Sequence, residues 1–187
     1  MKTITLAEHA GFCFGVGEAV QKASDALAQK EERKGPLYCL GELIHNKIAI
    51  EEFAQKGLIT IHNLSELQDG ASVLIRAHGE PPETFDIATK KKLKLIDATC
   101  PFVAKIHKLV SDAAQEGRQT IIIGDPNHPE VKSIFGWALG KAFIIYQDED
   151  VKSIACQLKN IPVSIVAQTT ITKERFDLCV AAVKQYA

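Results

Sequence analysis

The sequence KLIDATCPFVAKIHKLVSDAAQ, residues 94–115, places a short apolar run before a cysteine and a longer helical pattern after it. Residues 94–97 have the length of a buried strand, whereas residues 101–115 carry apolar positions at helical spacing. Pro101 suits the first helical position, because proline fixes a helical φ angle where no amide partner is needed. The stretch therefore predicts a strand, a loop that carries Cys100, and a helix.

The same alternation of short apolar runs and helical patterns continues along the chain. The other expected strands, each followed by its helix, are 3–6 and 15–30, 37–40 and 46–55, 72–76 and 82–91, 120–123 and 129–139, and 163–166 and 172–184. Strands that alternate with helices indicate βαβ units, so we predict an α/β fold with mainly parallel sheets.

Special residues recur at nearly constant spacing in the two halves of the chain. Three pairs lie 87, 83 and 90 residues apart, respectively: Cys13 and Cys100, His45 and His128, and His78 and Gln168. This recurrence indicates an internal duplication, so we predict two pseudo-symmetric α/β domains, residues 1–97 and 98–187. Ligands of parallel α/β units collect at the carboxyl ends of strands, and the two copies are therefore expected to direct thiols and imidazoles into one cleft.

The composition excludes several functional classes. Lys and Arg number 22 against 23 acidic residues, so a net charge of -1 offers no basic surface for nucleic acid or an anionic membrane. The apolar runs are far shorter than the roughly 20 residues of a membrane span, and no signal peptide is recognisable. Five cysteines, an odd number without a regular framework, indicate a reducing compartment, and we expect a cytoplasmic location.

Two cysteines have the setting of a metal ligand. Cys13 lies between Gly11 and Gly15, where the backbone can bend close to a bulky ligand, and Cys100 directly precedes Pro101. A thiolate at a helix start is favoured by the amide dipoles and binds soft metals. The alternative is a small buried apolar side chain, but the repeat symmetry favours ligation. The remaining cysteines are expected to be core or surface thiols: Cys39, Cys156 and Cys179.

Three histidines follow predicted strands: His45, His78 and His128. Imidazole donates hydrogen bonds to phosphate, and the helix starts that follow add amide donors, so these residues predict a diphosphate pocket. The alternative is a set of ordinary loop histidines. The other three lack this placement and are expected to be structural or exposed: His9, His62 and His107.

Two further polar residues are candidates for chemistry. Glu130 lies two residues after His128 at a predicted helix start, where a carboxylate either caps the helix or donates a proton. Thr169 follows a predicted strand at the place where the first repeat carries His78-Gly79, so we expect it to contact substrate. The plain alternative is a turn in which Thr170 or Thr172 caps the next helix.

Six motifs together resemble a known family. They are Gly11-Phe12-Cys13, His45-Asn46, Ala77-His78-Gly79, Asp97-Ala98-Thr99-Cys100-Pro101, His128-Pro129-Glu130-Val131 and Gln168-Thr169-Thr170. In order and spacing they resemble 4-hydroxy-3-methylbut-2-enyl diphosphate reductase, the last enzyme of the non-mevalonate isoprenoid pathway. The resemblance runs the length of the chain and implies three pseudo-symmetric α/β domains around a central cluster, of which this chain supplies two.

The resemblance also implies an activity and a role for each candidate residue. The family removes the substrate hydroxyl with two electrons and protons, giving isopentenyl and dimethylallyl diphosphate. By motif, Cys13 and Cys100 resemble two of three thiolates on a 4Fe-4S cluster, and the three histidines resemble the diphosphate ligands. Glu130 is implied as the proton relay and Thr169 as the neighbour of the hydroxyl. The implied partners are an allylic diphosphate and a ferredoxin- or flavodoxin-like electron donor.

One departure from the family pattern affects the expectation for this chain. The third cysteine motif and a later diphosphate loop rich in Ser and Asn have no counterpart, so we expect the chain alone to be inactive and to self-associate through exposed apolar faces. Two other readings stay open. One is a non-catalytic module in which Cys13 and Cys100, with or without a histidine, hold zinc or a small cluster, and the other is a redox or interaction domain with free thiols.

Overall fold

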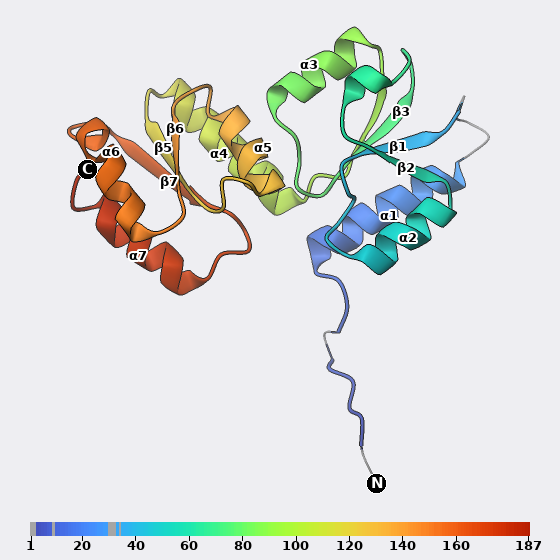
Figure 1. The fold of residues 1–187 in the computed structure, drawn as a ribbon, viewed down its shortest axis with the longest axis horizontal. Helices are drawn as coiled ribbons and strands as arrows, with labels where there is room; N and C mark the ends of the chain where they lie inside the picture. Colours follow the sequence, from blue (N-terminus) through green and yellow to red (C-terminus); the bar gives the residue numbers. More distant parts are fainter. Residues whose placement is uncertain (1–2, 9, 30–32, 34) are drawn as a thin grey trace.

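Each half of the chain builds its own parallel β-sheet. The computed structural model describes residues 3–8, 10–29, 33 and 35–187, and these form two α/β units that lie side by side (Figure 1). The predicted α/β class with parallel sheets is confirmed. The domain division after residue 97 stays a prediction, and its support is that the first sheet ends with a strand at Asp97.

The first unit contains four strands. Its elements are α1 (Phe14–Ala28), β1 (Leu37–Leu40), α2 (Lys47–Gln55), β2 (Leu58–Ile61), the 3-10 turn η2 (Leu64–Glu66), β3 (Ser72–Ile75), α3 (Pro82–Lys90) and β4 (Lys94–Asp97). The strand order is β2-β1-β3-β4, with every pair parallel.

The second unit follows the same plan with three strands. Its elements are α4 (Pro101–Gln115), β5 (Gln119–Ile123), α5 (Pro129–Trp137), β6 (Ala142–Ile145), the 3-10 turn η3 (Asp148–Asp150), α6 (Val151–Leu158), β7 (Val163–Ala167) and α7 (Lys173–Val183). The order β6-β5-β7 repeats β2-β1-β3, because in each unit the first strand pairs with the next two. This equivalence explains the constant spacing of the matched residues.

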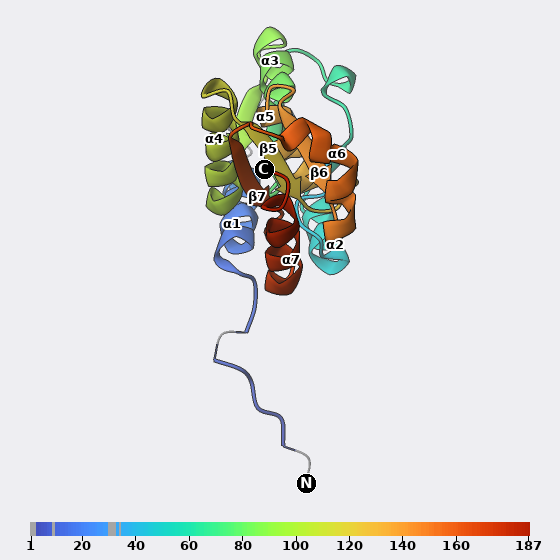
Figure 2. The ribbon, with the colours of Figure 1, turned by 90° about the vertical axis from the view of Figure 1, so that its left-hand side faces the viewer.

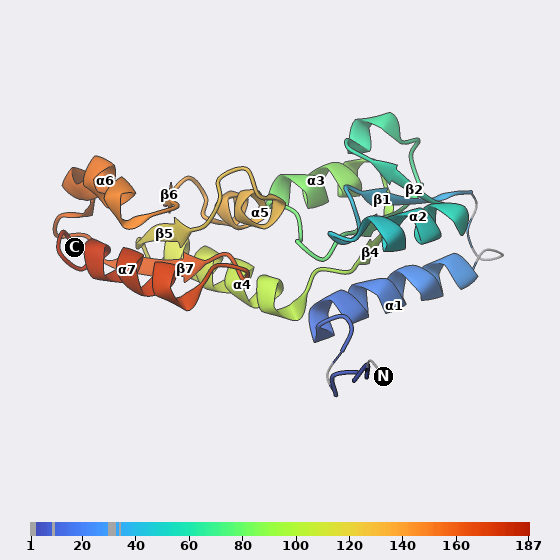
Figure 3. The ribbon, with the colours of Figure 1, turned by 60° about the horizontal axis from the view of Figure 1, so that its bottom comes forward.

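Helices cover both faces of each sheet, as Figures 1 and 3 show. The helices α1 and α2 pack on one face of the first sheet and α3 on the other. In the second unit α4 and α5 cover one face and α6 and α7 the other. Successive side chains of β5 point to opposite faces of the sheet, so both faces are buried. Ile121 and Ile123 face α6 and α7, whereas Ile122 faces α4 and α5. The helices α3 and α5 meet at the junction of the units (Figure 3).

Several predicted elements differ from the observed ones. The expected strand at residues 3–6 is wrong: these residues have no strand partner, and they run away from the body of the molecule beyond α1 (Figure 2). Ile4 is 96% exposed and Leu6 83% exposed, so neither side chain gains burial from an extended conformation here. The strands β2 and β6 and the helix α6 were not predicted. The ends of the other predicted strands and helices agree with the observed ends to within two residues. The helix predicted over 15–30 is an exception, because its last residue lies outside the described part of the chain.

No helix in the described part of the chain combines the length and the apolar character that a membrane crossing requires.

Candidate functional site

A cleft between the two units contains all the side chains that the sequence singled out. Its volume is about 360 Å³. The predicted residues that line it are Cys13, His45, His78, Cys100, His128, Glu130 and Thr169. They come from helix starts and from the loops that follow β1, β3, β5 and β7, where the carboxyl ends of parallel strands place a ligand. The expected convergence of the two repeats is therefore observed, while the chemical role of each residue stays a prediction.

The two cysteines occupy equivalent helix starts. Cys13 is the N-cap of α1 and Cys100 the N-cap of α4, and neither side chain makes a capping hydrogen bond. The Cys100 thiol lies directly against Gly15, where any Cβ would clash with the sulfur atom. Gly15 therefore allows the first turn of α1 to approach the start of α4. Both thiols are free, so both can bind a soft metal at the positive end of a helix.

The other three cysteines do not line the cleft. Cys39 lies in the core of the first unit, where burial raises its thiol pKa to about 12. Cys179 is buried in the second unit, and Cys156 is exposed on α6. Their positions match the prediction of core or surface thiols.

The three cleft histidines form a compact trio, which we call the histidine trio (His45, His78 and His128). The ring centroids lie 4.4 Å apart for His45 and His78, 5.3 Å for His45 and His128, and 5.4 Å for His78 and His128. His45 precedes the N-cap of α2, His78 follows β3, and His128 is the N-cap of α5. The trio thus combines two loops of the first unit with one helix start of the second.

Burial and neighbouring cations keep two members of the histidine trio uncharged. The pKa of His78 is lowered to about 3, mainly by burial and in smaller part by charge repulsion from His45, Arg76 and His128. The pKa of His128 is also lowered, mainly by burial, with partial opposition from the carboxylate of Glu130. Both rings are therefore neutral near pH 7. The His78 Nδ1 atom is buried and has no hydrogen-bond partner in the described part of the chain.

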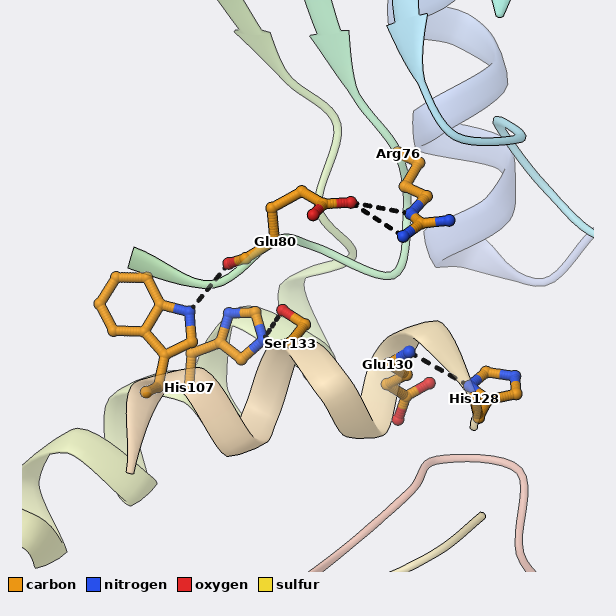
Figure 4. Close-up of polar contacts among 7 residues, drawn as sticks. Arg76, Glu80, His107, His128, Glu130 and Ser133 are labelled. Atoms are coloured by element: carbon orange, nitrogen blue, oxygen red, sulfur yellow. Dashed lines mark hydrogen bonds and ion pairs between the residues drawn. The ribbon is translucent and has the colours of Figure 1, made fainter. Parts of the chain in front are cut away.

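The proton of neutral His128 can be assigned from its hydrogen bond. The backbone N–H of Glu130 donates to His128 Nδ1 at 3.2 Å (Figure 4). A backbone N–H can only donate, so Nδ1 accepts and the proton of the neutral ring lies on Nε2. His128 thus offers an N–H donor, which suits an anion.

The histidine trio could also hold a metal ion, because one ring nitrogen from each residue lies within 4.8 Å of the others. Metal binding through Nε2 of His128 would require its proton to move to Nδ1 and would break the bond from Glu130. The trio therefore fits an anion better than a cation. Within the described residues, no group of three close potential ligands contains either cleft cysteine, so the zinc-module alternative gains no support.

Glu130 ties the start of α5 to the loop after β7, within the second unit. Its side chain belongs to the first turn of α5, and the residue is only 2% exposed. The carboxylate accepts the Thr169 backbone N–H at 2.6 Å and the Thr169 hydroxyl at 2.8 Å. Glu130 is therefore more than a helix-start carboxylate, since it fixes the loop after β7.

The neighbouring loop is held by Gln168. Its side chain accepts the backbone N–H of Asp125 at 3.1 Å and donates to the Thr170 hydroxyl at 2.7 Å. Thr172 caps α7 through its hydroxyl, as one of the two expected caps. Thr169 is thus left to face the cleft, together with Thr170.

The remaining histidines have no place in the cleft. His62 is exposed and His107 is buried at the junction of the units, as expected for exposed and structural residues. The prediction for His9 falls outside the described residues. Sequence reasoning missed the charged residues Arg76 and Glu80, which flank His78; a charged residue on each side of a loop histidine was the available signal.

The fold and the cleft define a class: an α/β protein of repeated parallel units whose strand ends enclose thiols and imidazoles. The chain belongs to the LytB protein family, which matches residues 4–187. The resemblance inferred from the six motifs is thereby confirmed.

Similar proteins carry a consistent description. The chain is 40% identical over 182 residues to the 4-hydroxy-3-methylbut-2-enyl diphosphate reductase of Alkaliphilus oremlandii, covering 97% of this chain and 63% of that protein. It is 40% identical over 179 residues to the same-named protein of Aquifex aeolicus, covering 94% and 60%, respectively. The chain thus spans less than two thirds of these relatives.

Solved structures agree with this relationship. The structure of the E-1-hydroxy-2-methyl-but-2-enyl-4-diphosphate reductase of Plasmodium falciparum matches with a TM-score of 0.88 at 34% identity, covering 95% of this chain and 55% of that chain. A structure described as (E)-4-hydroxy-3-methyl-but-2-enyl diphosphate reductase, the terminal enzyme of the non-mevalonate pathway, matches with a TM-score of 0.83 at 37% identity, covering 98% and 64%.

Proposed function

We propose that this chain provides two domains, residues 1–97 and 98–187, of a 4-hydroxy-3-methylbut-2-enyl diphosphate reductase. The reaction breaks the carbon–oxygen bond of the substrate hydroxyl. Two electrons and two protons replace this bond by a carbon–hydrogen bond and release the oxygen as water, while the diphosphate is retained. The observation that carries the proposal is the convergence of seven motif residues from both repeats on one cleft. The names of the relatives support the same reaction.

The two cleft thiols fit a share of a 4Fe-4S cluster. Cys13 and Cys100 are unpaired, lie at helix starts and present sulfur, the donor that iron–sulfur clusters require. The described residues offer no third cysteine to the cleft, so a further ligand has to come from elsewhere. When bound, such a cluster supplies electrons and an open iron that polarises the hydroxyl.

The histidine trio binds the diphosphate in this proposal. His128 offers its Nε2–H, and the starts of α2 and α5 add a positive dipole end beside His45 and His128. Hydrogen bonds to a charged phosphate are about twice as strong as neutral ones, so three of them give substantial affinity. The diphosphate would bridge the two units, because the trio draws on both.

Glu130 and Thr169 move a proton in this proposal. The Thr169 hydroxyl and a Glu130 carboxylate oxygen lie 2.8 Å apart, so protonated Glu130 can donate to Thr169, which in turn can donate toward the substrate hydroxyl. The second bond, from the Thr169 amide, holds the carboxylate in place. Because Glu130 is almost completely buried, exchange of this proton with water is restricted.

The proposed reaction needs two electrons from outside the chain. A ferredoxin- or flavodoxin-like protein delivers them in this proposal. The five free thiols agree with the reducing environment that such carriers occupy, and we place the protein in the cytoplasm on that ground.

Calorimetric titration tests the substrate assignment directly. The chain, kept reduced and free of oxygen, is titrated with 4-hydroxy-3-methylbut-2-enyl diphosphate and, as a control, with the same alcohol without the diphosphate. We expect the chain to bind the compound that carries the diphosphate and not the control alcohol. The affinity for that compound should be lower in His128→Ala. Equal binding of both compounds, or an unchanged affinity in His128→Ala, would contradict the proposal.

A further inference from the structure

A set of largely buried contacts surrounds the loop that carries His78. Arg76 and Glu80 form an ion pair, with Nη2 to Oε1 at 2.9 Å and Nε to Oε1 at 3.0 Å. The side chains are only 20% and 11% exposed, so this pair is shielded from water far better than a surface ion pair. In the sequence the two residues stand on either side of His78, in the segment that follows β3. Figure 4 shows their ion pair.

The same loop is tied to the second unit. Trp137 of α5 donates its indole N–H to the Glu80 carbonyl at 3.0 Å. Its ring stacks on His107 of α4, with centroids 5.5 Å apart and an angle of 19°. His107 in turn bonds Ser133 of α5, Nε2 to Oγ at 2.9 Å (Figure 4). His107 is 7% exposed and Ser133 1% exposed, so water does not compete for this bond.

Close glycine contacts join the loops to these side chains. The Arg76 guanidinium lies against Gly41, in the loop that leads to His45, so closely that any Cβ there would clash. Gly79 has a φ of +68° and lies against the His107 ring in the same way. Gly136 of α5 lies against Pro81. Each member of the histidine trio is thus carried by a segment that touches this network.

We propose that Arg76, Glu80, His107, Ser133 and Trp137 form a brace of positioning residues that holds the histidine trio in register across the two units. The proposal rests on the proposed function, because it concerns the site of the diphosphate. His45 and His78 belong to the first unit and His128 to the second, so their separation depends on how the units are joined. The bond from the Trp137 N–H to the Glu80 carbonyl crosses between the units. The ion pair fixes its first-unit end, and the ring stack fixes its second-unit end.

Trp137 offers the sharpest test of the brace. Trp137→Phe keeps an aromatic ring for His107 to stack on but removes the N–H that bonds the Glu80 carbonyl. Tyr146→Phe is the matched control, since Tyr146 is an aromatic residue of the same unit that packs on Arg175, away from the cleft. Imidazole NMR signals of the ligand-free chain and calorimetric titration with inorganic pyrophosphate are recorded for both variants, with thermal unfolding as a check of the fold.

The brace predicts a specific pattern in Trp137→Phe. The imidazole signals of His78 and His128 shift, and the affinity for pyrophosphate falls about 3- to 10-fold, the effect of one hydrogen bond. Because the loss acts through His128, it largely disappears when Trp137→Phe is added to His128→Ala. Tyr146→Phe changes neither measurement.

Two contrary results are distinguishable. Unshifted His78 and His128 signals in Trp137→Phe, or an equal loss of affinity in the His128→Ala background, would overturn the brace. If those signals shift as expected but the unaltered chain binds no pyrophosphate, the brace stands as a joint between the units and the proposed function fails instead.

Discussion

Thr169 gives Glu130 two hydrogen bonds, one from its backbone N–H at 2.6 Å and one from its hydroxyl at 2.8 Å. The two residues are 39 positions apart in the second unit, and both line the cleft. The threonine hydroxyl therefore has a fixed proton acceptor or donor, depending on the protonation of the carboxyl group. A helix-start carboxylate that merely interacted with the helix dipole would need neither bond.

Glu130→Gln should separate binding from turnover. In a complete reductase that contains these residues, glutamine keeps the size of the side chain and can still accept from Thr169 but has no acidic proton to give. We expect turnover to fall by roughly a hundredfold or more while the substrate still binds. Steady-state rates and calorimetry measure the two effects. Near-normal turnover would return Glu130 to a structural role.

The two cleft cysteines should govern iron binding. Replacing Cys13 or Cys100 by Ser in the complete protein should remove the cluster, because a hydroxyl is a far poorer ligand for a soft metal than a thiolate. Cys156→Ser is a suitable control, since Cys156 is exposed on α6 and outside the cleft. Iron content and visible absorbance after anaerobic reconstitution provide the measurement. Equal iron loss in all three variants would refute the assignment.

Substitutions in the histidine trio should weaken diphosphate binding without loss of iron. Each of His45→Ala, His78→Ala and His128→Ala removes one hydrogen bond to a charged group, worth about 1.5–3 kcal/mol. Calorimetry gives the affinity and elemental analysis the iron content. A variant that loses iron but keeps its affinity would identify that histidine as a metal ligand instead.

Much of this fold follows from patterns that are local in sequence. Pro101 at the start of α4 and the apolar spacing behind it predicted that helix with its observed ends. The strand β6 was missed because Ala142–Ile145 is a short run with a half-exposed pattern, so periodicity alone had little to detect. The segment at 3–6 has a strand-like composition, but a strand also needs a hydrogen-bonding neighbour, which local sequence does not reveal.

For the cleft, the sequence predicted the lining residues but not the contacts between them. Its lining residues could be listed from the motifs and the duplication, because matched positions of repeated units meet at strand ends. The bond between Glu130 and Thr169 and the stacking of Trp137 on His107 could not be, since they depend on how segments far apart in the sequence pack together. Gly15 illustrates the same limit: its contact with Cys100 joins residues 85 positions apart and has no local signature.

Stability should fall as the solution becomes mildly acidic. Burial lowers the pKa of His107 to about 4 and that of His78 to about 3, against 6.5 for an ordinary histidine. Below pH 6.5 the unfolded chain therefore binds protons that the folded chain does not, and the free energy of unfolding decreases. The slope is up to about 1.4 kcal/mol per pH unit for each histidine.

Urea unfolding at pH 7.5, 6.0 and 5.0 measures this slope. His107→Gln should flatten it by about one histidine's share, whatever it does to the stability at pH 7.5. An identical slope in the parent chain and in His107→Gln would show that His107 does not stay neutral in the folded state.

The starts of α1 and α4 should make the isolated chain self-associate. Phe12, Phe14 and Phe102 are 51%, 64% and 62% exposed, beside the contact of Cys100 with Gly15. Clustered exposed aromatic rings favour association, because contact removes apolar surface from water. Sedimentation velocity should show oligomers whose fraction rises with concentration and falls in Phe14→Ser/Phe102→Ser. Purely monomeric behaviour at about 100 µM would contradict this expectation.

The isolated 187-residue chain should also lack reductase activity. Cys13 and Cys100 are the cysteines that the described residues offer to the cleft, and two thiolates hold a cubic cluster less firmly than three. The chain, reconstituted with iron and sulfide without oxygen, is assayed for reduction of the hydroxylated diphosphate with a strong artificial electron donor. We expect no turnover above that of Cys13→Ser, while diphosphate binding, which depends on the histidine trio, persists. Turnover comparable to that of a full-length relative would mean that the cleft as described is sufficient for the chemistry.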